Sequence, residues 1–161
     1  MASYEDLKVA AKRVIDANNY MVLGTSDPTG RPWVSPVYFT PDAYIDFYWV
    51  SSSEALHSQN IARRPDISIV VFDSQVPIGA AEAVYMSARA EEIADSDLEL
   101  CAEIYSGRLP EARGFGPEQL RAPALLRLYR ATVAEHSILI RGGDPDHGRG
   151  VDSRMTLTLS R

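Results

Sequence analysis

The stretch that decides the fold is GRPWVSPVYFTPDAYIDFYWVSSSEALHSQNIARRPDISIVVFD, residues Gly30 to Asp73. It is typical of a turn, a strand, a second turn, a second strand, a capped helix and a third strand. Small polar residues stand at the strand ends and at the start of the helix, namely Ser35, Ser51, Ser52 and Ser53. Hydroxyls and helix amides in such a place can hold the charged tail of a ligand.

The first two strands of this stretch have distinct patterns. Residues Pro32 to Phe39 form the first, and the internal Pro36, which cannot donate to a ladder, indicates an edge strand, a bulge or a break that faces a ligand. The second, Tyr44 to Ser51, alternates with a period of two, as a half-buried strand does. The pattern predicts a bulky inner face of Ile45, Phe47 and Trp49.

A short helix and an apolar strand complete the stretch. Ser53 is the expected N-cap of a helix that runs from Glu54 to about Arg63. The helix is expected to end there because the residue before Pro65 avoids helical dihedral angles. The run ISIVVFD after this proline predicts a central strand.

The rest of the chain adds helices and strands around this unit. Apolar residues at helical spacing predict a first helix, capped by Ser3 and ending near Asn18. A further helix is expected to end at Gly107, and one helical turn is expected near Glu118. Further strands are predicted in Tyr20–Ser26, Ala83–Ile93, Leu125–Ile140 and Met155–Leu159. The fold class is therefore mainly β (α+β), an antiparallel sheet of about six to seven strands that closes into a barrel, with two to four helices.

Length and composition bound the organisation and the partners. The 161 residues predict one domain spanning 1–161. A net charge of −6 argues against a protein that coats nucleic acid or anionic lipid, since both need concentrated positive charge. No apolar run approaches the roughly 18 residues of a membrane span. The single cysteine, Cys101, allows no intrachain disulfide, so a reducing, cytoplasmic setting is expected.

Three runs together resemble a known family. They are GRPWVSPVYF, then FYWVSSSEALHSQNIARRPDISIVVFD, then AVYMSARAEEI, and the order strand, strand, helix, RRP, strand is their most specific part. The chain is similar over Tyr20 to Ile93 to the pyridoxamine 5'-phosphate oxidase-like family, the FMN-binding split barrels. This resemblance implies a homodimer with two flavin sites at the subunit interface and redox chemistry on a small substrate.

The resemblance also implies which residues would bind the cofactor. Ser35, Pro36 and Val37 would line the isoalloxazine ring. Trp49, Val50, Ser51 and Ser52 would lie along the ring and the ribityl chain. His57 and Ser58, in the helix, would face the phosphate.

The chain departs from the oxidases of the family at the phosphate. Where those members present an Arg-Lys pair, this chain has Leu56 and His57, and Ser35 stands at the arginine-bearing strand position. A charge-assisted hydrogen bond is roughly twice as strong as a neutral one, so this change predicts a weaker phosphate site or a different ligand. Three hypotheses follow: an FMN-dependent or deazaflavin-dependent oxidoreductase, a non-catalytic dimer that binds a flavin, a deazaflavin or heme, and a structural dimer without a ligand.

One acidic loop and the tryptophans have simpler interpretations. Residues Asp144, Asp146, His147 and Asp152 cluster in a glycine-rich loop, but their spacing fails the calcium-loop pattern, so a solvated turn is favoured over a metal site. Trp33 and Trp49 are expected in the core or in a dimer interface.

Overall fold

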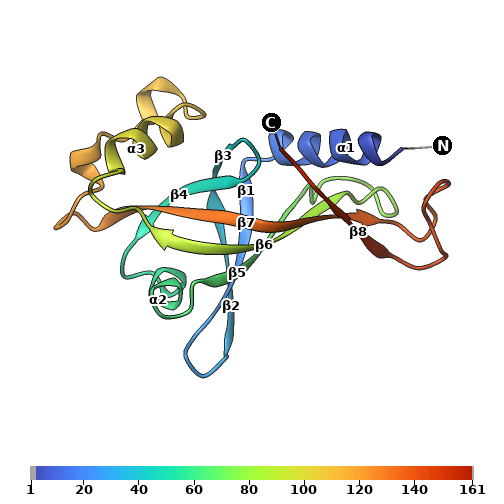
Figure 1. Ribbon diagram of the computed structural model, residues 1–161, viewed down its shortest axis with the longest axis horizontal. Coiled ribbons are helices and arrows are strands. Elements are labelled where there is room, and N and C mark those ends of the chain that lie inside the picture. The colour runs from blue at the N-terminus through green and yellow to red at the C-terminus, as the bar shows by residue number, and fades with distance from the viewer. Residues whose placement is uncertain (1–2, 161) are drawn as a thin grey trace.

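The structure is a computed structural model that describes residues 3–160. Figure 1 shows one curved antiparallel sheet with helices along its faces and at one end. The strands in this range are β1 (Tyr20–Ser26), β2 (Pro32–Tyr38), β3 (Thr40–Asp42), β4 (Asp46–Ser52), β5 (Asp66–Phe72), β6 (Ala83–Glu92), β7 (Leu126–Ile140) and β8 (Ser153–Leu157). The helices are α1 (Tyr4–Ala17), α2 (Leu56–Arg63) and α3 (Leu98–Ser106), with 3-10 turns at η1 (Glu111–Arg113) and η2 (Pro117–Gln119).

The sheet returns on itself through one short link in the chain. Its order is β2-β1-β5-β6-β7-β4-β3, and β8 pairs with β7. The two ends of this order, β2 and β3, are separated by the single residue Phe39. One half of the segment 32–42 therefore pairs with β1 and the other half with β4, which gives a split barrel. The predicted fold class is confirmed, with eight strands in the described residues in place of six to seven.

The strand predicted over Tyr44–Ser51 begins later, at Asp46. Ala43 and Tyr44 have φ angles of 52° and 59°, which is left-handed backbone that non-glycine residues rarely adopt. The Tyr44 side chain is held by α1, because its hydroxyl donates to Asp16 at 2.8 Å and the Lys12 ammonium lies 4.9 Å from its ring centroid. These tertiary contacts hold a turn at Ala43 and Tyr44, where the sequence has no glycine or asparagine that would predict left-handed backbone.

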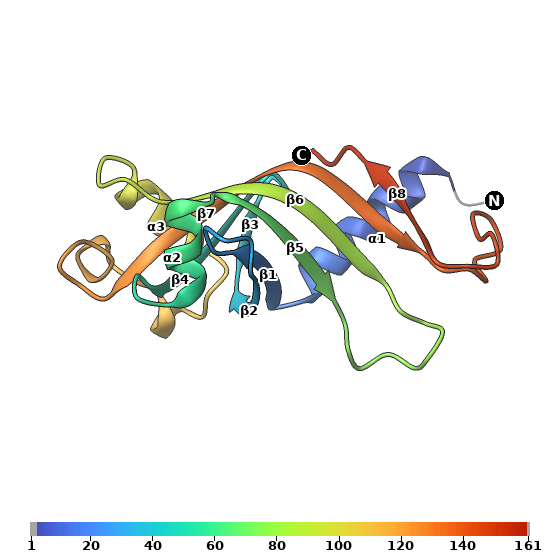
Figure 2. The same ribbon diagram turned by 90° about the horizontal axis from the view of Figure 1, so that it is seen from below.

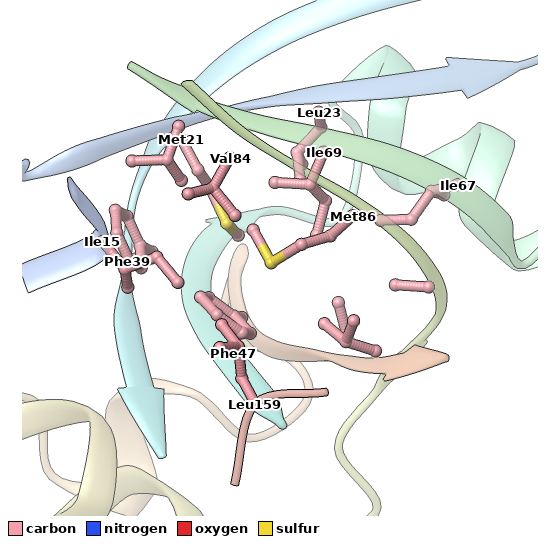
Figure 3. Close-up of a cluster of buried hydrophobic side chains, with 14 of the residues drawn as sticks. Ile15, Met21, Leu23, Phe39, Phe47, Ile67, Ile69, Val84, Met86 and Leu159 are labelled. Carbon is pink, nitrogen blue, oxygen red and sulfur yellow. The ribbon is translucent and has the colours of Figure 1, made fainter. Parts of the chain in front are cut away.

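The main core lies inside the curve of the sheet (Figure 3). Met21 and Leu23 of β1 and Phe47 of β4 are fully buried there, together with Phe39 at the link. Helix α1 packs on β5 and β6 and buries Ile15 in the same cluster. The capping box predicted for this helix is present, since Ser3 and Asp6 exchange hydrogen bonds.

A second apolar cluster lies between α3 and the outer face of β4. Tyr48 is 3% exposed there and packs with Leu98, Cys101 and Leu128. The period of two in β4 predicted a half-buried strand, but α3 covers its second face as well. Both faces of this strand are therefore buried.

Two hairpin loops extend away from the barrel, as Figure 2 shows for the β5–β6 and β7–β8 connections. Arg141 Nη1 joins them by donating to the Gly79 carbonyl at 2.9 Å. None of the helices in residues 3–160 is long and apolar enough to cross a membrane.

Candidate functional site

The residues predicted to bind a cofactor in β4 point to opposite faces. Trp49 is fully buried in the main core, where its ring stacks on Tyr129 with centroids 5.6 Å apart. Val50, the next residue, packs in the cluster under α3. One planar ligand cannot contact both side chains on a single face, so only the backbone of this strand could follow such a ligand.

A serine and a histidine join the end of β4 to the first turn of α2. Ser51 Oγ and His57 Nε2 lie 2.8 Å apart, and His57 is buried. Burial lowers the pKa of the His57 imidazole from its ordinary value of 6.5. The ring is therefore neutral at neutral pH, and it serves as a hydrogen-bonding group with no fixed charge.

Helix α2 starts two residues later than predicted, and Ser53 is not its cap. The N-cap is Ala55, which offers no side-chain hydrogen bond. Ahead of it the chain makes a separate turn, in which Ser52 Oγ accepts from the Glu54 amide at 3.1 Å and the Ser52 carbonyl accepts from the Ala55 amide. The first amides of a helix have no intrahelical acceptor, so this helix start is open to an external anion.

Buried and surface hydrogen bonds fix α2 against the β1–β2 hairpin. Asn60 Nδ2 donates to Thr25 Oγ1 at 3.1 Å, and both residues are buried. At the other end of the helix, Arg64 Nη2 donates to the Pro28 carbonyl at 2.8 Å. The helix start is therefore placed rigidly beside β2.

Strand β2 presents its predicted residues on two faces. Val37 is buried opposite Met21, and Ser35 pairs with Leu23 and accepts a hydrogen bond from Trp33 Nε1 at 3.0 Å. Pro36 is exposed on the outer face, and β2 lies at one end of the sheet order, as the proline predicted.

Sequence reasoning missed a small cavity between the β1–β2 turn and α2. It measures about 180 Å³. The cavity is lined by Asp27, Arg31, Pro32, Trp33, Leu56 and Asn60. Residues 27–33 and 56–60, which line the cavity, lie far apart in the chain. The sequence around Arg31 indicates only a reverse turn, so no local pattern predicts the cavity.

A second hollow lies on the outer face of the sheet. It measures about 340 Å³, and its floor contains Gly24, Ser68 and Ser87, which are paired side by side across β1, β5 and β6. A Cβ added at Gly24 would lie 2.6 Å from Ser68 Oγ, so a larger residue there would force that hydroxyl to move. Exposed apolar side chains flank it, including Val34 at 69% exposure.

The acidic loop is an ordered turn. Asp144 Oδ1 accepts from the amides of Asp146 and His147, and Asp152 Oδ1 accepts from the Gly142 amide. Within residues 3–160, no three His, Cys, Asp or Glu side chains gather where they could hold a metal ion.

The chain matches one protein family and several solved structures. The family model described as pyridoxamine 5'-phosphate oxidase matches residues 7–137. A search of curated proteins gave no match.

The similar structures share the fold at low sequence identity. A heme binding protein from Mycobacterium smegmatis is 18% identical with a TM-score of 0.69, and the match covers 97% of this chain and 59% of that protein. The heme storage protein HutZ from Vibrio cholerae is 22% identical with a TM-score of 0.61, over 76% of this chain and 86% of HutZ. An F420 reductase is 16% identical with a TM-score of 0.57, over 78% and 94% of the two chains.

Proposed function

From the premise that the chain belongs to the pyridoxamine 5'-phosphate oxidase family, we propose that it is an FMN-dependent oxidoreductase of a small substrate. The observation that carries the proposal is the bond between Ser51 and His57, which brings the end of β4 to the open start of α2. A flavin needs an apolar wall for its ring and a dipolar or positive place for its phosphate. The open start of α2 meets the second need, and the apolar contact would come from the exposed Pro36 and from the backbone of β4, because Trp49 and Val37 are buried in the core.

Each predicted residue has a role in this proposal. The backbone of β4 from Trp49 to Ser52 and the β2 residues Ser35, Pro36 and Val37 bind the ring and the ribityl chain. His57 and Ser58 stand at the phosphate with the first amides of α2. A bound flavin supplies the hydride-transfer chemistry, and the protein residues bind it, orient it and exclude water.

Two other cofactors give alternative functions. A similar structure is an F420 reductase, so a deazaflavin is the first alternative. Two similar structures are heme proteins, which keeps a non-catalytic heme binder as the second. In this chain His57 Nε2 is hydrogen-bonded to Ser51 Oγ and His136 Nε2 to the Tyr44 carbonyl, so on each of these two rings only Nδ1 would be left to bind heme iron.

The proposal includes a homodimer with cofactor sites at the subunit interface. The outer face of β1, β5 and β6 supports it, because this face combines exposed apolar residues with the hollow over Gly24 and Ser68. A second copy packed on this face would cover it. On this proposal, residues 1–161 form one cofactor-binding domain.

Titration of the apoprotein tests the function. We expect FMN to bind with a change in its visible absorbance and to raise the melting temperature, since a ligand at 100 times its dissociation constant stabilises a fold by roughly 2.7 kcal/mol. Deazaflavin F420 and heme are titrated in parallel. The FMN-loaded protein should then be reduced by a nicotinamide donor and reoxidised by an electron acceptor.

Each outcome separates one function from another. Binding of heme or F420 without FMN would replace the proposed cofactor. Binding of FMN without turnover with any nicotinamide donor would indicate that the protein is a non-catalytic carrier or sensor. An apoprotein that binds none of the three would refute the proposal.

A further inference from the structure

We propose that Arg31 supplies the positive charge for the cofactor's phosphate, an inference that rests on the FMN binding proposed above. The three positions at which the oxidases carry cations are Ser35, Leu56 and His57 in this chain. None of these three side chains carries a fixed positive charge. The structure offers a guanidinium at a different place, in the turn between β1 and β2.

The cavity next to α2 brings Arg31 to the start of that helix. Arg31, Leu56 and Asn60 line the same space of about 180 Å³. Leu56 is the first residue of α2, directly after the uncapped Ala55. Of the described residues that line this cavity, Arg31 is the one with a cationic side chain. A phosphate at the open helix start would therefore lie within the field of one nearby guanidinium.

The backbone of Arg31 is fixed while its side chain stays available. Its amide donates to Asp27 Oδ1 at 3.0 Å, and its carbonyl accepts from the Asp27 amide at 3.0 Å. The guanidinium makes no hydrogen bond or ion pair with any residue between 3 and 160. Of the other arginines near α2, Arg64 donates to the Pro28 carbonyl and Arg127 pairs with Glu92, while Arg63 lies in the last turn of α2, at the opposite end from Leu56.

The turn and the helix form one rigid frame around the cavity. Asn60 bonds to Thr25 at the end of β1, and Arg64 bonds to Pro28 in the turn itself. Arg31 lies on the same turn, so its distance from the helix start does not depend on a flexible loop. This arrangement lowers the ordering cost of binding an anion there.

One carboxylate also lines the cavity and opposes an anion. Asp27 Oδ1 accepts from the Thr29 amide at 2.8 Å, from Thr29 Oγ1 at 2.7 Å and from the Arg31 amide. These hydrogen bonds, of which the one from the Thr29 hydroxyl acts most strongly, lower the pKa of Asp27. The charge of Arg31 also lowers this pKa, so Asp27 is ionised at neutral pH, and part of its charge is satisfied by the hydrogen-bond donors of the turn.

Comparison of FMN with riboflavin tests the proposal, because riboflavin lacks only the phosphate. We expect Arg31→Ala to weaken FMN binding roughly tenfold or more, since a hydrogen bond to a charged group contributes about 1.5–3 kcal/mol. Riboflavin affinity should stay within about twofold of that of the unchanged protein. The FMN affinity of Arg31→Lys should lie between those of Arg31→Ala and the unchanged protein, because lysine keeps the positive charge and loses the forked geometry of the guanidinium.

A matched variant controls for net charge. Arg113→Ala removes one exposed arginine from η1, away from β2 and α2, and should change neither affinity. Arg31→Gln provides a second neutral variant that keeps a long polar side chain, and its melting temperature without flavin checks the fold.

The results separate this inference from the function on which it rests. If the unchanged protein binds FMN and both neutral variants bind it equally well, the phosphate lies elsewhere and Arg31 has no such role. An equal loss of FMN and riboflavin affinity also overturns the inference, since it would reveal a contribution to the ring site or the fold. If the unchanged protein binds no flavin, the proposed function itself fails.

Discussion

Two buried histidines, His57 and His136, set how stability depends on pH near neutrality. Burial lowers the pKa of both from 6.5, although the hydrogen bond of His136 to the Tyr44 carbonyl partly opposes this. Between pH 6.5 and the lower folded values, the unfolded chain binds more protons than the folded one. The free energy of unfolding should therefore be steady above pH 6.5 and fall as the pH drops below it.

Urea unfolding at pH 7.5, 6.5 and 5.5 measures this dependence. We expect the decline below pH 6.5 to shrink in His57→Gln and to shrink further when His136→Gln is added. The carboxyls of Asp6, Asp27 and Asp144 have pKa values lowered from 3.8, so they contribute only at more acidic pH. A free energy of unfolding that does not change between pH 7.5 and 5.5 would contradict the prediction.

At the residue scale, local pattern predicted which side chains are small, polar or aromatic, but not what covers them. The alternation in β4 correctly predicted that Phe47 and Trp49 face the core. It could not reveal that α3 also buries Tyr48, because that helix lies some 50 residues further along the chain. The cavity at Arg31 was missed for the same reason, since it forms only where residues of α2 pack beside the β1–β2 turn.

Helix α2 depends on its neighbours for its start. Ala55 has extended dihedral angles suited to an N-cap residue and lacks the side-chain acceptor that such a residue usually provides. Replacing Ala55 with aspartate should stabilise the protein without flavin by about 1 kcal/mol, which raises the melting temperature by roughly 2–4 °C. The same carboxylate would compete with a phosphate, so FMN binding should weaken.

Thermal unfolding and FMN titration of Ala55→Asp provide the two readouts. Ala112→Asp adds the same charge at an exposed site in η1 and should change neither the melting temperature nor the FMN affinity. A gain in FMN affinity with Ala55→Asp would show that the phosphate is not bound at this helix start.

At the element scale, most helices and strands could be predicted, and the errors have a common cause. The first helix with its Ser3 cap, the helix that ends at Gly107 and the helical turn at Pro117–Gln119 follow from spacing and capping residues. The start of α2 and the start of β4 do not follow from such local signals. At both places hydrogen bonds from distant residues, such as that between Tyr44 and Asp16, outweigh local preference.

The proposed dimer is a property of the whole molecule, and a single bulky charge tests it. Ser68 is exposed at the floor of the hollow on the outer sheet face, next to Gly24. Ser68→Arg would place a cation in the proposed interface, so we expect the dimer to dissociate and FMN binding to be lost with it. Burial of an unpaired charge is costly enough to separate the subunits.

Sedimentation and light scattering give the molar mass. Ser96→Arg, an exposed serine outside this face, should leave a dimer intact. A single-chain mass for the unchanged protein at micromolar concentration would contradict the proposed assembly.

The one-residue link at Phe39 restricts how this barrel can change. Because residues 32–38 pair with β1 and residues 40–42 pair with β4, a slip on one side drags the other side with it and turns buried side chains outward. The number of residues between Pro32 and Asp42 is therefore fixed by strand pairing at both ends of this segment, whereas the connection from Arg141 to Asp152 leads only to the added strand β8. We expect one residue inserted between Pro32 and Asp42 to abolish folding. One residue inserted between Arg141 and Asp152 should be tolerated.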